Sequence, residues 1–256
     1  MNKTLVIEIS YGGLGDLLFH SHLPRIAKEY GGFQKVLINQ TAPVRHADYA
    51  RLVWEPNPYV DGFTDQTGIK IDIGVAIQLI EPGCNLLDSI MKLYGLSDGK
   101  RMHEPEIYYK PRFIKEYNIT IYDPNFISWV GDIDKRDVMW HTKKHAIKLN
   151  AYMKLRNDKA LFIPPKGMRM IDTPTIFDYC DLVHSAAVFY CLTSGSAAIA
   201  SALGKKAIAF YGFPQSKGIH HSGLHEYIRI ERCPRYKISN FVKTPIKQLL
   251  KIFKGK

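Results

Sequence analysis

A glycine turn followed by a carboxylate is the first feature of this chain that could do chemistry. Residues 12–15 (GGLG) contain Gly13 and Gly15, and Asp16 follows directly. A β-rich apolar run, residues 5–9, precedes the turn, and leucines at helical spacing follow it. A strand, a glycine turn and a helix in this order let a ligand approach the backbone and offer it free N–H groups and a positive dipole end. Asp16 is then either a functional carboxylate or a helix-start charge that complements the dipole.

A second turn of the same form lies late in the chain. The apolar run 187–193 (AVFYCLT) ends in a small-residue turn, and a helical stretch comes next. The residues expected to meet a phosphate or a sugar hydroxyl there are Thr193, Ser194, Gly195, Ser196 and Ala197. One such turn in each half of the chain predicts two α/β domains that face each other across a cleft.

The elements around the two turns alternate between strand and helix. Strand-like stretches include residues 35–39, 71–77 and 118–122, and helical patterns include residues 85–94 and 141–156. A further helix is expected over residues 174–184, with Thr173 as its cap. Such alternation is typical of parallel sheets covered by helices on both faces.

The prolines and polar residues of 102–111 (MHEPEIYYKP) interrupt the alternation and indicate a linker. We therefore expect an N-terminal domain over residues 1–111 and a C-terminal domain over residues 112–256.

Composition limits the classes of protein to consider. The chain has 256 residues and a net charge of +11, which would attract nucleic acid, an anionic membrane or phosphorylated small molecules. No element interleaves basic and aromatic residues as a nucleic-acid interface would, so no nucleic-acid partner is expected. No signal peptide or membrane-spanning stretch is evident, and the four cysteines form no C-x-x-C pair, so we expect a cytoplasmic protein with reduced thiols.

Two stretches together resemble glycosyltransferase family 9, the heptosyltransferase-like enzymes. They are residues 11–31 (YGGLGDLLFHSHLPRIAKEYG) and residues 178–212 (DYCDLVHSAAVFYCLTSGSAAIASALGKKAIAFYG). Lys135, Arg136 and Trp140 are similar to a K-R-W element of that family. The resemblance implies the GT-B architecture, in which two Rossmann-like α/β domains face each other across a cleft. It also implies transfer of a sugar from a nucleoside diphosphate donor to a glycan or lipid-linked acceptor, as in bacterial surface polysaccharide synthesis, without a cofactor.

The resemblance assigns roles to several residues. Asp16 matches the family's catalytic aspartate, the base that takes the proton of the acceptor hydroxyl. Gly13, Gly15 and residues 193–197 are expected to bind the donor, with Lys135 and Lys217 as cations for the leaving diphosphate. His20, one helical turn after Asp16, either orients Asp16, contacts the acceptor or is a polar residue packed near the domain interface.

The second turn departs from the family pattern. Where the family has Asp-Thr-Gly and a histidine, this chain has Thr193, Ser194, Gly195 and Ala198. Side-chain contacts to the donor sugar are therefore altered. The sequence is thus compatible with a donor other than ADP-heptose. The alternatives to a transferase are a nucleotide-sugar epimerase with the same paired domains and a non-catalytic protein that binds nucleotide sugars or glycans.

Two patterns suggest a metal site, and for each of them we favour an interpretation without a metal. Asp132 and Asp134 spell D-x-D, but the charged, irregular stretch around them is typical of a solvated loop. His220, His221 and His225 lack a fourth ligand at a suggestive spacing, so a donor contact is preferred to zinc. No metal site is therefore expected.

The C-terminal residues 244–256 (TPIKQLLKIFKGK) have apolar residues at helical spacing with lysines between them. They predict either a last helix that packs on the protein or an interfacial helix in peripheral contact with an anionic membrane.

Overall fold

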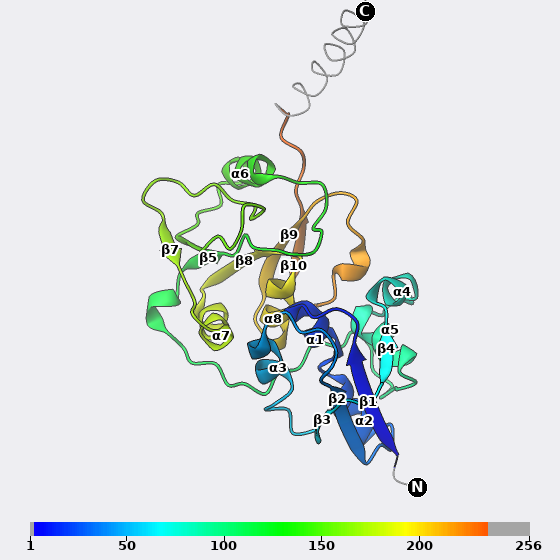
Figure 1. The fold of residues 1–256 in the computed structure, drawn as a ribbon. Helices are drawn as coiled ribbons and strands as arrows, with labels where there is room; N and C mark the ends of the chain where they lie inside the picture. Colours follow the sequence, from blue (N-terminus) through cyan, green and yellow to red (C-terminus); the bar gives the residue numbers. More distant parts are fainter. Residues whose placement is uncertain (1–2, 235–256) are drawn as a thin grey trace, which may run out of the picture.

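A computed structural model describes residues 3–234 and contains two parallel sheets (Figure 1). The first sheet has the order β3-β2-β1-β4, from β1 (Thr4–Ile9), β2 (Lys35–Asn39), β3 (Gly62–Thr64) and β4 (Ile69–Ile71). The second has the order β10-β9-β8-β5-β6-β7, from β5 (Thr120–Tyr122), β6 (Ala151–Met153), β7 (Arg169–Ile171), β8 (Val188–Leu192), β9 (Ala207–Tyr211) and β10 (Glu226–Arg229). The predicted α/β fold with paired parallel sheets is confirmed. The predicted tail helix, 244–256, lies outside the described residues.

Two helices, α1 and α8, lie between the sheets and pack against each other (Figure 1). The helices of the first half are α1 (Leu14–His20), α2 (Leu23–Glu29), α3 (Ala47–Val53), α4 (Ile73–Gln78) and α5 (Leu86–Leu93). Those of the second half are α6 (Lys135–Lys144), α7 (Ile176–Ser185) and α8 (Gly195–Ala202), with the short 3-10 helices η1 (Lys115–Tyr117) and η2 (Lys217–Ile219). Within residues 3–234, none of these helices is long and apolar enough to cross a bilayer.

The α1–α8 contact is part of a continuous apolar core. Leu17 and Leu18 of α1, Ile199 of α8 and the strand residues Ile7 and Phe189 are fully buried in one cluster. Because α8 carries mainly alanine and serine on its buried surface, its backbone can approach α1 closely. The starts of the two helices are therefore fixed relative to each other.

The segment around Pro111 forms bonds to both halves. Glu106 pairs with Arg25 of α2 at 2.8 Å, and Arg112 donates from Nε to Asp181 of α7 at 2.7 Å. The strands of the first sheet precede this segment and the strands of the second follow it. The domain boundary at residues 111 and 112 itself stays a prediction.

Two predicted elements are wrong. The strand expected over 71–77 ends at Ile71, because the carboxylate of Asp72 accepts a hydrogen bond from the amide of Val75 and starts α4. The helix expected over 141–156 covers the end of α6 and all of β6. Ala146, with a φ of 50°, stops the helical path between them.

The cap expected for α7 is also wrong. Thr175, and not Thr173, caps that helix, since the side chain of Thr175 accepts from the amide of Asp178.

Candidate active site

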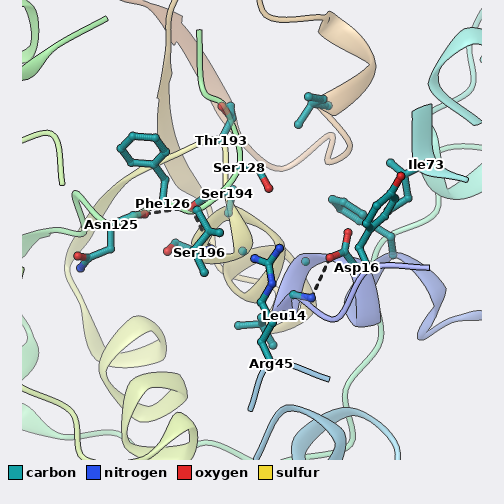
Figure 2. A pocket seen from close by; sticks show the side chains of 18 of the residues that line it. Leu14, Asp16, Arg45, Ile73, Asn125, Phe126, Ser128, Thr193, Ser194 and Ser196 are labelled. Carbon is teal, nitrogen blue, oxygen red and sulfur yellow. Dashed lines mark hydrogen bonds between the residues drawn. The ribbon is translucent and has the colours of Figure 1, made fainter. Parts of the chain in front are cut away.

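A cavity of about 460 Å³ lies where the two halves of the chain meet. Figure 2 shows Asp16 and Ile73 on one side of it and Asn125, Phe126 and Ser194 on the other. Of the residues predicted from the sequence, those that line the cavity are Gly13, Gly15, Asp16, Thr193, Ser194, Gly195, Ser196 and Ala197. The structure thus brings the two small-residue turns to one site.

At the start of α1 the carboxylate of Asp16 folds back over the glycine turn. The amide of Gly13 donates to Asp16 Oδ2 at 2.9 Å, and the amide of Asp16 donates to the carbonyl of Gly13 at 3.0 Å. A Cβ atom at position 13 would lie 2.8 Å from Asp16 Oδ2. Glycine at this position is therefore needed for the carboxylate to take up this place.

The surroundings of Asp16 make it a stronger base than an ordinary aspartate. Burial raises the pKa of Asp16 to about 6, against the hydrogen bond from Gly13 and the positive charge of Arg45, which both lower it. A carboxylate with this pKa is largely ionised at neutral pH and binds a proton more readily than an exposed one. Those are the properties of a general base.

Arg45 reaches the cavity on a loop that sequence reasoning overlooked. The amide of Arg45 donates to the carbonyl of Gly12 at 2.9 Å, and a Cβ atom at position 12 would lie 2.1 Å from the carbonyl oxygen of Pro43. Glycine is required at position 12 because the backbone at Pro43, and not a ligand, passes directly against it. The crossing places the Arg45 side chain against Gly13 at the cavity wall.

At the start of α8 the helix end is available to an anion. The Ser194 Oγ caps the helix by accepting from the amide of Ser196 at 3.3 Å, and the first turn contains no acidic residue. The amide of Gly195 has no hydrogen-bond partner among residues 3–234. The positive end of the α8 dipole, which no acidic side chain neutralises, and the free amide of Gly195 both lie at the cavity.

The two helix starts touch at their glycines. A Cβ atom at Gly195 would lie 3.4 Å from the Cβ of Leu14 and 3.5 Å from the amide nitrogen of Gly15. A larger side chain at position 195 would separate α1 from α8. The contact therefore sets the distance between the Asp16 carboxylate and the amides of α8.

Asp123, at the end of β5, holds α8 in place and was missed from the sequence. Its Oδ2 accepts from Tyr179 Oη and Ser196 Oγ, both at 2.6 Å. Its Oδ1 accepts from the amide and the Nδ2 of Asn125, at 3.0 and 2.8 Å. The Ser196 hydroxyl thus belongs to this network, and the donors around Asp123 balance its buried charge.

Asn125 carries the network on to the end of β6. Its Oδ1 accepts from the amide of Arg156 at 2.9 Å, and its Nδ2 donates to the carbonyl of Lys154 at 3.1 Å. Arg156, which follows β6, is held in this way at the cavity lining. The signal available in the sequence was the general rule that ligands bind beyond the carboxyl ends of parallel strands.

Three predicted site residues do not line the cavity. His20 is buried, and its Nδ1 donates to the main-chain carbonyl of Asp16 at 2.8 Å, so it braces the helix turn and not the carboxylate. Burial lowers the pKa of His20 to about 4, which keeps the ring neutral. Lys135 lies at the start of α6 and Lys217 is exposed in η2.

The residues that suggested a metal have other roles. Asp134 caps α6 by accepting from the amides of Arg136 and Asp137, and neither it nor Asp132 lines the cavity. His225 joins β9 to α8, since its Nδ1 accepts from the amide of Ala207 and its Nε2 donates to the carbonyl of Ala197. His221 lines the cavity. In the part of the chain that the structure describes, His, Cys, Asp and Glu side chains form no group that could hold a metal ion.

Comparison with known proteins gives matches to structures alone. No protein-family model and no curated protein matches the sequence. A family 9 glycosyltransferase from Veillonella parvula aligns at 8% identity and a TM-score of 0.55, over 95% of this chain and 90% of that one. The ADP-heptose LPS heptosyltransferase II of E. coli aligns at 12% identity and a TM-score of 0.52, over 90% of this chain and 91% of that one.

TibC, an iron-containing dodecameric glycosyltransferase of enterotoxigenic E. coli, aligns at 13% identity and a TM-score of 0.59. The alignment covers 91% of this chain and 64% of TibC, so this chain spans less than two thirds of that protein. These likenesses agree with the resemblance seen in the two glycine-turn stretches. The chain therefore has the fold of the heptosyltransferase-like enzymes of glycosyltransferase family 9.

Proposed function

We propose that the protein is an inverting glycosyltransferase that moves a sugar from a nucleoside diphosphate to a hydroxyl of a glycan or lipid-linked acceptor. One observation carries the proposal. The buried carboxylate of Asp16 and the uncompensated N-terminus of α8 meet across one cavity. The first is suited to accept a proton and the second to hold a diphosphate.

The reaction follows from this arrangement. The acceptor oxygen attacks the anomeric carbon of the donor as Asp16 takes the hydroxyl proton. The bond between that carbon and the diphosphate oxygen breaks, and the electron pair leaves with the diphosphate. The amide of Gly195 and the guanidinium groups of Arg45 and Arg156 stabilise the charge that develops on the leaving group. Lys135, Lys217 and His20 have no role in this mechanism.

The comparison supports ADP-heptose as the first donor to test. One TibC structure, which aligns at a TM-score of 0.58, is a complex with ADP-D-β-D-heptose. Because Thr193 and Ser194 stand where the family has Asp-Thr, other nucleotide sugars belong in the same test. Synthesis of a surface polysaccharide such as LPS or capsule, in the cytoplasm or at the inner face of the cell membrane, is part of this proposal.

A thermal-shift screen over nucleoside diphosphate sugars tests the proposal. A ligand present at 100 times its dissociation constant should stabilise the protein by about 2.7 kcal/mol. The sugar that binds should then be consumed when an acceptor is added. Turnover of the nucleotide sugar without an acceptor would instead indicate the epimerase. Absence of stabilisation by every nucleotide sugar would overturn the proposal.

A further inference from the structure

The part of the cavity next to Asp16 has an apolar wall. We call this surface the acceptor wall, and it consists of Phe19 of α1, Ile73 and Ile77 of α4, Leu86 of α5 and Ile219 of η2. Ile73 lies beside Asp16 in Figure 2. Four separate elements thus contribute apolar side chains to one surface beside the proposed base.

The acceptor wall is closed by direct packing between the two halves. A Cβ atom at Gly218 would lie 2.8 Å from Ile77 Cγ2, so α4 packs closely on η2. The ring of His221 packs edge-on against Phe19, with 5.0 Å between the ring centroids. His221 Nε2 is buried without a partner among the described residues, and burial lowers the pKa of His221 to about 3, so the ring is neutral. The wall therefore bears no charge.

The opposite side of the cavity is mixed in character. Polar side chains of Asn125, Ser128, Asn157, Thr193 and Ser194 line it together with the apolar side chains of Phe126, Ile127 and Trp129. The polar groups and the amide of Gly195 suit the diphosphate and the hydroxyls of the donor. The attacking hydroxyl must lie beside Asp16, so the rest of the acceptor must extend along the acceptor wall.

We infer that the acceptor is a neutral amphiphile, with an apolar group attached close to the hydroxyl that attacks and packed on Phe19, Ile73 and Ile77. This inference rests on the proposed glycosyl transfer and deepens it. Arg45 is the one cationic side chain that residues 3–122 contribute to the described lining. A carboxylate or phosphate placed on the wall would lose water without gaining a partner, whereas an apolar group there is stabilised by burial.

The test compares two probes that differ in their apolar part. Binding of methyl and octyl β-glucoside, below the micelle concentration of the latter, is measured by calorimetry on the protein saturated with nucleoside diphosphate. We expect octyl glucoside to bind at least tenfold more tightly, since burial of about two methylene groups suffices for that factor. The preference should fall to about twofold in Ile73→Asn and to an intermediate value in Ile73→Ala.

Val75→Asn is the matched control. Val75 belongs to the same helix, is 48% exposed and does not line the cavity, so its substitution should leave the octyl preference unchanged. Equal binding of the two glucosides, or an octyl preference that survives in Ile73→Asn, would overturn the inference. Binding of the nucleotide sugar, measured separately, should be the same in all variants. Its absence from the wild type would overturn the proposed transferase, whereas its presence without an octyl preference would overturn the acceptor inference alone.

Discussion

The starts of α1 and α8 have the same local form and opposite electrostatics. Both follow a parallel strand, and both begin at a turn of small residues. The first turn of α1 carries Asp16, whose carboxylate accepts from the amide of Gly13. The first turn of α8 carries no acidic residue, and the amide of Gly195 is without a described partner.

The difference shows how one motif can serve two purposes. At α1 the helix end is occupied by the protein's own carboxylate, which is therefore fixed in place. At α8 the helix end is left for an anion from outside. Contact between the two turns then holds a fixed base and an open anion site on one cavity. Substitutions that disturb one turn and spare the other can test this division.

The largest effect on donor binding is expected from Gly195→Val. The new side chain would meet Leu14 and Gly15, push α1 from α8 and cover the free amide. Donor affinity, measured by calorimetry, should fall at least about 100-fold, because an anion site and its geometry are lost together. Ala202→Val, at the far end of the same helix and outside the cavity lining, should bind donor normally. Unchanged donor affinity in folded Gly195→Val would show that the donor does not bind at the start of α8.

A smaller effect is expected at the other turn from Gly13→Ala. The added Cβ atom would lie 2.8 Å from Asp16 Oδ2 and displace the carboxylate. Turnover should drop about tenfold while the donor dissociation constant stays within about twofold, since the α8 turn is untouched. Steady-state kinetics together with calorimetry measure the two values. A parallel loss of donor affinity would contradict the division between the turns.

Ser194→Ala should have a modest effect on both stability and donor binding. Loss of the cap should cost about 1 kcal/mol of unfolding free energy, and the disturbed first turn should weaken donor binding a few-fold. Thr175→Ala removes the cap of α7 in the same way but lies outside the cavity lining. It should lower the melting temperature by a similar amount and leave the donor dissociation constant alone. Equal weakening by both variants would assign the effect to stability.

The smallest effect is expected from a chelator. Asp134 caps α6, and neither Asp132 nor Asp134 lines the cavity, so EDTA should leave the rate of transfer unchanged. Loss of activity in EDTA with recovery in Mn²⁺ would instead indicate that Asp132 and Asp134 hold a metal ion that binds the donor.

Much of the site could be predicted from local patterns. Both turns were recognisable because a strand, small residues and a helix follow one another within a few residues. Asp16 and residues 193–197 were found for that reason. The shared core of α1 and α8 explains why turns so distant in sequence meet at one cavity.

The rest depended on contacts that no local pattern reports. Arg45 is placed by the chain crossing at Gly12, and Asp123 by a network that joins three separate elements. His20 lies at the helical spacing from Asp16 that was expected, but its ring reaches the main-chain carbonyl. The apolar run 71–77 was compatible with strand and helix alike, and the Asp72 cap decided between them.

The stability of Asp16→Asn reports on the buried charge. The pKa of Asp16 is raised from its usual value of 3.8 to about 6, so the folded state binds the proton more tightly than the unfolded state. Stability from this group is therefore lost as the pH rises from about 4 through 6. The Asn variant, which keeps an acceptor for Gly13, should be more stable than the wild type at pH 7 by an amount on the order of 1 kcal/mol. The difference should vanish near pH 4.

The rate of transfer by Asp16→Asn tests the central claim most directly. A general base at this position predicts a fall of roughly 10²- to 10⁴-fold in kcat with the donor dissociation constant nearly unchanged. In the wild type kcat/KM should decline below a pH of about 6, as Asp16 becomes protonated, and the residual rate of the variant should lack that decline. Near-normal turnover in folded Asp16→Asn would contradict the account.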